Sequence, residues 1–267
     1  SLSAVTVAPA ADAHVTLPVP WDATSPLARV LASPTCEKVG EDLKRAAIVL
    51  ARHDVPLAGP LFDIGVASYV LDPSRPSHGV DELARHFLGM VAPGEDATIR
   101  PPWTARTALA LRPVLERALE EHGALALFHD VEMPLLVVLV AMERRGVRVD
   151  AAALAALSSE YRSTLAAIEA EIYALAGGPF NVGSPIQLRE VLFERLKIST
   201  RGLRKGKTGI SLDVDAMHRL AGVHPLPAKI LEHRALAKLL STYIDPLPLL
   251  IHPETGRIHT SLNQTVT

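Results

Sequence analysis

The chain has little cysteine, few aromatic residues and no long apolar run. Cys36 is the single cysteine among 267 residues, which excludes a disulfide framework and any metal site built from several cysteines. No stretch of about 18 apolar residues occurs, so the sequence predicts no membrane-spanning helix. The first residues lack the charged and apolar regions of a signal peptide. We therefore expect a soluble intracellular protein, with Cys36 as a small buried side chain.

The composition favours a globular, mostly helical protein. Hydrophobic residues make up 48% of the chain, but aromatic residues make up only 4%, and Ala and Leu are abundant. The net charge of −2 says nothing about partners by itself, but it is unevenly spread. Residues 1–150 hold 14 basic and 19 acidic side chains, whereas residues 151–267 hold 13 and 10.

One segment of the second half concentrates positive charge. Its basic residues, with no carboxylate between them, are Arg195, Lys197, Arg201, Arg204, Lys205 and Lys207. Most such runs are solvated loops. The alternative is a surface that faces phosphate groups, and the segment alone does not decide between them.

The first 122 residues predict mixed strands and helices. Two short β-branched segments, VTVAPA and HVTLPV, indicate a hairpin. Helical spacing of apolar residues follows at 25–31 and 41–53, and LAGPLFDIGVASYVLD reads as a strand that passes into a helix. A short helix from Asp81 ends at Gly89, residues 90–103 predict a loop, and residues 104–122 predict a helix.

Long helices dominate the rest of the chain. MPLLVVLVAMERRG predicts a buried helix, and Asp150 is a good N-cap for the next one. That helix carries an apolar seam at Leu154, Leu157, Tyr161, Leu165, Ile168, Ile172 and Leu175. Short helices are expected after Ser184 and near Asp213, and a second long helix at 227–243. The pattern predicts two long helices that form a hairpin with a decorated tip, followed by two short strands around the turn Pro-Glu-Thr-Gly.

Four stretches of the second half resemble the family-A DNA polymerases, the DNA polymerase I type. They are FHDVEMPLLVVLVAMERRGVRVD, FNVGSPIQLREVLFERL, ILEHRALAKLLSTYIDPLPLLIHPETGRIHT and the terminal SLNQTVT. The resemblance covers about residues 125–267 in order. Residues 1–122 are similar to the family's 3′–5′ exonuclease or exonuclease-like domain through KVGEDLK and LFDIGVASYVLD.

The resemblance implies a layout of two parts. Residues 1–122 would be an incomplete, degenerate RNase H-like α/β domain, and residues 123–267 a mostly helical thumb hairpin with the first strands of the palm. In the family, the palm carboxylates that hold two metal ions lie beyond the position of Thr267. The resemblance thus implies a DNA-directed DNA polymerase that uses Mg²⁺, with no cofactor and no catalytic activity in these residues alone.

The exonuclease-like part can be searched for the carboxylates that would bind metal ions. A proofreading exonuclease holds two divalent metals with clustered carboxylates. Ala46 stands where the family's second metal-binding Asp is found, and Trp103 stands at the third; neither side chain can ligate Mg²⁺. We therefore expect an inactive, structural domain. Asp63 is expected to be a structural hydrogen-bonding residue beside a strand.

With no catalytic activity expected in these residues, the function that the sequence favours is nucleic-acid binding. The helix after Ser184 would point free backbone N–H groups at a phosphate. The resemblance places twelve residues at DNA-contacting positions: Asn181, Ser184, Gln187, Lys205, Lys207, Thr208, Ser211, Arg234, Lys238, Asn263, Gln264 and Thr267. Asp213, where the family often has Ser, would put an acid at the contact or cap the next helix. Such contacts are independent of base sequence.

Two alternatives remain open: an active proofreading exonuclease, and a helical interaction module that does not bind DNA. The favoured interpretation is a piece of a DNA polymerase whose partner is primer–template duplex DNA. It implies a monomer in the bacterial cytoplasm, associated with the nucleoid and not with a membrane.

Overall fold

The computed structural model describes residues 4–10, 13–18, 25–96, 98–206 and 209–266. The chain divides into two compact units: unit 1 comprises Ser1–Gly146 and His259–Thr267, and unit 2 comprises Val147–Ile258. This division differs from the predicted domain boundary at residue 122. It places the helix before Gly146 and the C-terminal segment with the first domain, because both pack against that domain. The assignment of residues 1–122 and 123–267 as evolutionary domains stays a prediction.

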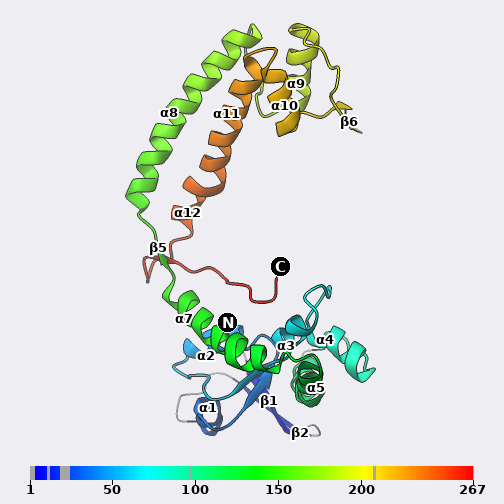
Figure 1. Cartoon of the computed structure of the whole chain (residues 1–267). Coiled ribbons are helices and arrows are strands. Elements are labelled where there is room, and N and C mark those ends of the chain that lie inside the picture. Colours follow the sequence, from blue (N-terminus) through cyan, green and yellow to red (C-terminus); the bar gives the residue numbers. More distant parts are fainter. Residues whose placement is uncertain (1–3, 11–12, 19–24, 97, 207–208, 267) are drawn as a thin grey trace. The chain divides into compact units, whose positions relative to one another are not determined.

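Unit 1 combines short strands with helices (Figure 1). Its strands are β1 Ala4–Ala10, β2 Ala13–Pro18, β3 Lys38–Gly40 and β4 Leu61–Asp63. Its helices are α1 Pro26–Ala32, α2 Leu43–Ala51, α3 Ile64–Leu71, α4 Val80–Leu83, α5 Arg100–Glu121, α6 Leu125–Leu127 and α7 Met133–Arg145, with π-helical turns η1 Ala84–Leu88 and η2 Phe128–Glu132. The predicted hairpin is confirmed as β1–β2, which is antiparallel. β3 pairs with β4 in parallel, with Val39 opposite Phe62.

The core of unit 1 gathers around α5. Leu111, Leu115 and Leu119 are fully buried at helical spacing, and the rings of Phe62 and Phe128 lie 4.8 Å apart. The predicted loop at 90–103 is wrong in its last part, because α5 begins at Arg100. Proline is tolerated in the first turn of a helix, where its missing N–H is not needed, so Pro101 and Pro102 do not prevent this start.

Asp63 joins three elements at the end of β4. One carboxylate oxygen accepts hydrogen bonds from the backbone N–H groups of Gly65 (2.9 Å) and Val66 (3.1 Å), which caps α3. The other oxygen accepts from the N–H of Leu43 at the start of α2, at 2.7 Å. The predicted structural role of Asp63 is confirmed. Burial raises the pKa of this carboxyl to about 6, against the opposing effect of the N–H donors.

Unit 2 is a long helical hairpin with small elements at one end (Figure 1). Its helices are α8 Ala151–Ala176, α9 Pro185–Arg189, α10 Val214–Ala221, α11 Leu226–Leu239 and α12 Pro246–Leu249, with π-helical turns η3 Glu190–Arg195 and η4 Leu240–Ile244. Its strands are β5 Val147–Arg148, β6 Lys205–Gly206, β7 Gly209–Ile210 and β8 Arg257–Ile258. The predicted N-cap Asp150 is confirmed, since its carboxylate accepts from Ala153 N–H. The expected pairing across the turn Pro-Glu-Thr-Gly is confirmed by an antiparallel bridge between His252 and Arg257. The second strand, β8, also pairs with β5.

The core of unit 2 occupies only part of the predicted seam of α8. Ile168, Ile172 and Ala176 are buried together with Ile230 of α11 and Leu188 of α9. The first half of the seam is more open, and Leu157 is 37% exposed. The reason is that α9, η3 and α10 supply apolar side chains only toward the C-terminal half of α8.

Two burial predictions are wrong. Cys36 is exposed, in a turn where its N–H donates to Ser33 Oγ. The predicted buried helix is α7, but only Met133 and Leu136 of its residues are buried. The stretch Leu125–Arg145 is also long and apolar enough to cross a membrane by length and composition alone, and only 17% of its most apolar window is buried. The absence of a long apolar run therefore did not exclude such a helix.

We expect Ile172→Ala to destabilise unit 2 by about 2–5 kcal/mol, because it opens a cavity in a core where Ile172 is fully buried. Leu157→Ala on the same helix is the matched control and should cost under about 1 kcal/mol, since that side chain is already partly in water. Denaturant unfolding of both variants checks this. Equal losses would contradict the core described above.

We expect stability to fall as pH rises from about 4 to 6, because folded Asp63, with its pKa raised to about 6, still holds a proton that the unfolded chain has released. The contribution is on the order of 3 kcal/mol across the window. Asp63→Asn cannot ionise and should flatten this part of the profile. Urea unfolding at several pH values measures it, and an unchanged slope in Asp63→Asn would count against a raised pKa.

Candidate nucleic-acid interface

The basic segment of unit 2 is held in place by arginine side chains. We call residues 199–213 the tip loop. Three arginines from three different elements donate to its backbone carbonyls: Arg189 Nε to Ile210 O at 3.0 Å, Arg219 Nη1 to Gly202 O at 3.1 Å, and Arg234 Nη1 to Leu212 O at 2.9 Å. β6 and β7 are only two residues each. The three arginine bonds therefore hold the loop backbone at positions that the strands do not reach.

Ser211 and Asp213 close the tip loop. Ser211 N–H donates to Arg204 O at 2.9 Å, and Ser211 Oγ donates to Asp213 Oδ2 at 2.9 Å. Asp213 also accepts from Ala216 N–H at 2.8 Å, which caps α10 and, with the Ser211 bond, lowers the pKa of this carboxyl. The helix-capping role considered for Asp213 is confirmed. These hydrogen bonds therefore stabilise the ionised form of the Asp213 carboxylate.

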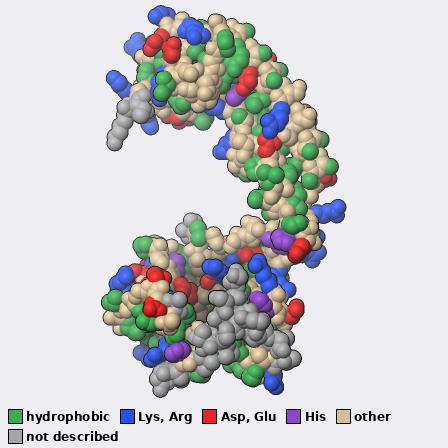
Figure 2. Space-filling model, turned by 180° about the vertical axis from the view of Figure 1, so that it is seen from behind, with side chains coloured by type: hydrophobic (Ala, Val, Ile, Leu, Met, Phe, Trp, Pro, Cys, Tyr) green, Lys and Arg blue, Asp and Glu red, His purple; other side chains and the backbone are tan. Residues whose placement is uncertain are grey.

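The basic side chains of the segment differ in their roles. Arg195 donates to Ala176 O, the last residue of α8, at 3.2 Å. Among the described residues, Lys197, Arg201, Arg204 and Lys205 are exposed and their side chains have no hydrogen-bond or ion-pair partner. Lys207 and Thr208 lie outside the described residues. Figure 2 shows Lys and Arg side chains gathered at the end of unit 2 that carries the tip loop. The loop thus presents cations to solvent on a positioned backbone.

Asn181, Ser184 and Gln187 form one local network before α9. Asn181 N–H donates to Gln187 Oε1 at 2.7 Å, Gly183 N–H donates to Asn181 Oδ1 at 2.9 Å, and Ser184 Oγ accepts from Gln187 N–H. The predicted N-cap Ser184 is confirmed. Their side-chain oxygens bond to the backbone, so the amide N–H₂ groups of the exposed Asn181 and Gln187 are left as donors.

Arg234 and Lys238 lie one turn apart on α11 but in different surroundings. Arg234 is turned onto the Leu212 carbonyl, and burial lowers the pKa of its guanidinium from the usual range. Lys238 is exposed. The equal spacing on the helix therefore does not give the two side chains equal access to solvent.

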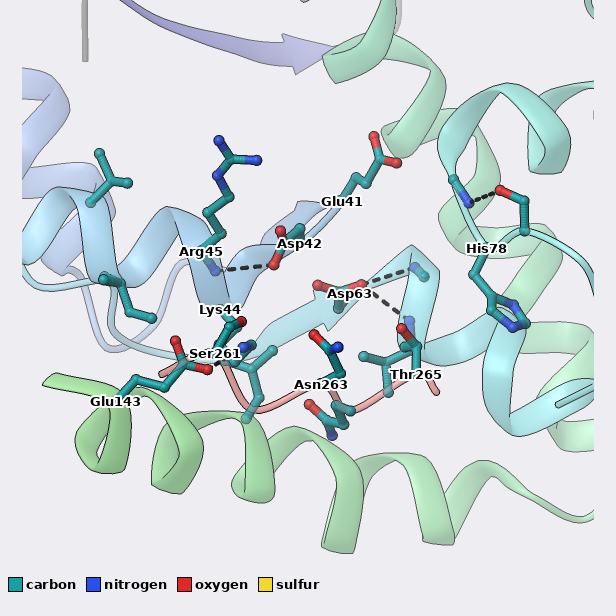
Figure 3. A pocket seen from close by; sticks show the side chains of 18 of the residues that line it. Glu41, Asp42, Lys44, Arg45, Asp63, His78, Glu143, Ser261, Asn263 and Thr265 are labelled. Carbon is teal, nitrogen blue, oxygen red and sulfur yellow. Dashed lines mark hydrogen bonds and ion pairs between the residues drawn. The ribbon is translucent and has the colours of Figure 1, made fainter. Parts of the chain in front are cut away.

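Asn263 and Gln264 belong to unit 1, where they line a cavity of about 1050 Å³ (Figure 3). Arg45, Asp63 and Glu143 also line it. Gln264 Nε2 donates to Glu132 O at 2.8 Å and to Glu132 Oε2 at 2.7 Å, which fixes its side chain. Asn263 is exposed, and Thr267 lies outside the described residues.

The two positions predicted to be degenerate in the exonuclease-like domain, Ala46 and Trp103, lie in helices of unit 1. Ala46 lies on α2, and Trp103 packs against the core of unit 1 with the Arg100 guanidinium 5.1 Å from its ring centre. Arg100 in turn binds both oxygens of Asp81 at 2.6 Å. Within the described residues no three His, Cys, Asp or Glu side chains are placed to hold a metal ion. The loss of a two-metal exonuclease site at these two positions stays a prediction.

The sequence did not predict any of the three arginine anchors, and it named Arg234 only as a DNA-facing residue. Arg189 and Arg219 lie outside the basic segment, and nothing in their spacing signals a bond to a loop 21 or 17 residues away in sequence. It also missed the ion pair between Lys44 of α2 and Glu143 of α7, which joins residues 99 positions apart.

Comparisons with known proteins agree with the resemblance. The family model for DNA polymerase family A matches residues 151–267. The model for the ribonuclease H-like domain of DNA polymerase I matches residues 8–95. DNA polymerase I of Synechocystis is 38% identical over 260 residues, covering 90% of this chain, and the thermostable DNA polymerase I of Thermus aquaticus is 42% identical over 247 residues, also covering 90%.

A solved structure extends the likeness to the fold. The polymerase domain of Pol1 from M. smegmatis, in complex with DNA primer-template and dNTP, superposes with a TM-score of 0.81 at 30% identity, covering 95% of this chain and 44% of that one. The chain spans 26% of the length of the Synechocystis relative and 29% of the Thermus aquaticus relative. The mixed α/β first unit, the helical second unit and both family matches show that the chain belongs to the family-A DNA polymerases, as a fragment of the DNA polymerase I type with its exonuclease-like domain.

Proposed function

We propose that unit 2 is the thumb of a DNA-directed DNA polymerase and that its tip loop grips the product duplex. The observation that carries this is the set of exposed cations, Arg201, Arg204 and Lys205, on a loop whose backbone is fixed by arginine–carbonyl bonds. A fixed loop loses little conformational freedom when its cations meet phosphates. The Pol1 neighbour, whose structure contains a DNA primer-template, supports the same assignment.

The proposed contacts are independent of base sequence. Lys205, Lys207 and Lys238 supply charge, and Asn181, Ser184, Gln187 and Thr208 supply hydrogen bonds to the sugar–phosphate backbone. Ser211 joins them when its hydroxyl turns from Asp213 to a phosphate. Arg234 is proposed to act at the same surface while it holds Leu212. Asn263, Gln264 and Thr267 are proposed to contact primer–template next to the palm. A polymerase moves along every sequence, so it requires contacts of this kind.

We propose that the exonuclease-like domain is inactive and structural. Ala46 and Trp103 cannot replace metal-binding carboxylates, and Asp63 is committed to three backbone donors. Residues 1–267 alone are proposed to lack polymerase activity. Mg²⁺ would serve the polymerase that contains this chain, through residues outside it. With its bacterial relatives, the protein is proposed to act as a monomer in the cytoplasm, associated with the nucleoid.

We expect no 3′–5′ exonuclease activity from this chain, because two metal-binding positions are Ala46 and Trp103. The measurement is release of label from the 3′ end of a single-stranded oligonucleotide with Mg²⁺ or Mn²⁺. A preparation from cells that do not express the chain, purified in the same way, controls for contaminating nuclease. Metal-dependent degradation of the oligonucleotide that persists through purification would support the proofreading alternative.

We expect the logarithm of the duplex-DNA binding constant to fall with log[salt] at a slope of about −4, if four or five cations meet phosphates. Arg204→Ala with Lys205→Ala should reduce the slope by about 2 and weaken all base sequences alike. Fluorescence anisotropy of a labelled duplex over a salt series measures this.

The matched control is Arg85→Ala with Arg117→Ala, which removes two exposed cations from unit 1 and should leave the slope nearly unchanged. If the salt slope is the same with and without Arg204 and Lys205, or if one base sequence is preferred, the interaction-module alternative is favoured over a thumb.

A further inference from the structure

One glutamate of α7 joins three parts of unit 1 that lie far apart in the sequence. Lys44 of α2 pairs with Glu143 Oε1, and the same oxygen accepts from Leu262 N–H at 2.7 Å. The backbone carbonyl of Glu143 accepts from His259 Nδ1 at 2.8 Å. Glu143 therefore attaches residues 259–265, which we call the C-terminal segment, to both α7 and α2.

Burial distinguishes the pair of Lys44 and Glu143 from the other ion pairs. The two side chains are 12% and 10% exposed. In every other ion pair among the described residues, at least one side chain is 34% exposed or more. Exposed pairs contribute little to stability, but a buried charge that loses its partner is strongly unfavourable. Neither Lys44 nor Glu143 can therefore change position without a cost to the other.

The C-terminal segment is held on both sides of Asn263. Leu262, the preceding residue, is bonded to Glu143, and Gln264, the following residue, donates to Glu132. Asn263 itself is exposed and lines the cavity that Figure 3 shows. Because both neighbours of Asn263 are attached, its backbone has little freedom, and its amide is presented to the cavity in a fixed direction.

Two adjacent cations of α2 line this cavity in different states. The ammonium of Lys44 is paired with Glu143, so it is not available to a ligand. Arg45 is exposed, and its side chain has no hydrogen-bond or ion-pair partner among the described residues. Lys44 therefore acts on the protein itself, whereas Arg45 offers a control position with the same charge.

We propose that Lys44 is a positioning residue: through Glu143 it fixes the C-terminal segment and so the direction in which Asn263 meets primer–template. The ammonium keeps the carboxylate where its oxygen accepts from Leu262 N–H. Without the ammonium, the buried carboxylate turns towards water and releases Leu262.

This role links the two matched parts of the chain. Lys44 lies within the residues that match the ribonuclease H-like domain, and Asn263 lies within those that match DNA polymerase family A. The exonuclease-like domain thus has a definite task, which is to orient a DNA contact of the polymerase part. The inference rests on the proposed contact of Asn263 with primer–template, so the experiments below measure the segment and the contact separately.

The first test measures amide hydrogen exchange of the C-terminal segment by mass spectrometry. Lys44→Met removes the ammonium, and we expect it to speed exchange of the segment by about tenfold or more, since a charge-assisted hydrogen bond is lost. Arg45→Met is the matched control, which removes a cation from the next position of α2 and should leave this exchange unchanged. Exchange of the buried core residues of α5 in the same samples shows whether each variant is folded.

The second test exchanges the two charges, with Lys44→Glu and Glu143→Lys in one chain. This chain keeps a buried pair of opposite charges, so it also serves if Lys44→Met does not fold. A lysine side chain has donors only, so Leu262 N–H is left without an acceptor, and we expect fast exchange of the segment here too. Protection equal to that of the unchanged chain, in either Lys44→Met or the charge exchange, would overturn the proposal.

The third test measures the DNA contact. Asn263→Cys, made with Cys36→Ser because Cys36 is exposed, is labelled with a photoactivatable azide and irradiated with a primer–template. Adding Lys44→Met should lower cross-linking by at least about twofold, because the segment is then out of place for much of the time, and adding Arg45→Met should not.

Equal cross-linking with and without Lys44 would also overturn the proposal. If no cross-link forms even when Lys44 is present, the proposed contact of Asn263 with DNA is contradicted, and with it the functional half of this inference. The exchange measurements then show separately whether Lys44 holds the segment.

Discussion

The fold of unit 1 depends on one buried carboxylate. Asp63 ends β4, caps α3 through two N–H groups and holds the first residue of α2 through a third. A strand end and two helix starts all leave backbone donors without partners, and a single short acidic side chain satisfies three of them. The cost is a carboxylate in an apolar place, which is why burial raises the pKa of Asp63. The three hydrogen bonds of Asp63 give this acid a structural role in unit 1.

Unit 2 uses positive charge in two different ways. Arg189, Arg219 and Arg234 are anchors, because each donates to a carbonyl of the tip loop. Arg201, Arg204 and Lys205 remain exposed on the loop that these anchors hold. The guanidinium group suits the first role, since its fixed fork of donors can bind a carbonyl while keeping its charge. Basic side chains close to the tip loop are therefore not all available to a ligand.

One side of α7 is apolar and exposed. Its residues are as apolar as those of a core helix, yet only Met133 and Leu136 are buried. Unit 1 covers one side, and the C-terminal segment reaches the helix through Glu132 and Glu143. Apolar surface of this kind is stable in water only at a cost that burial against a partner removes.

The sequence by itself determined the local structure and the family. Asp150, Ser184 and Asp213 cap helices as their residue types predict, because capping involves atoms only two or three residues apart. The strand-to-helix passage at Asp63 and the hairpin of long helices were also predictable, from apolar periodicity and length. Four polymerase-like stretches identified the family, whereas the departures from the exonuclease pattern at Ala46 and Trp103 stay predictions.

Only the tertiary structure decided which surfaces are covered. Apolar periodicity indicates which face of a helix is apolar, but it does not indicate whether other residues of this chain cover that face. The exposure of α7 and of the first half of the α8 seam could therefore not be predicted. The same holds for charge: Arg195 and Arg234 read as members of a basic surface, but each bonds to a carbonyl 19 or 22 residues away. Such bonds form between groups that only folding brings together, so no local pattern records them.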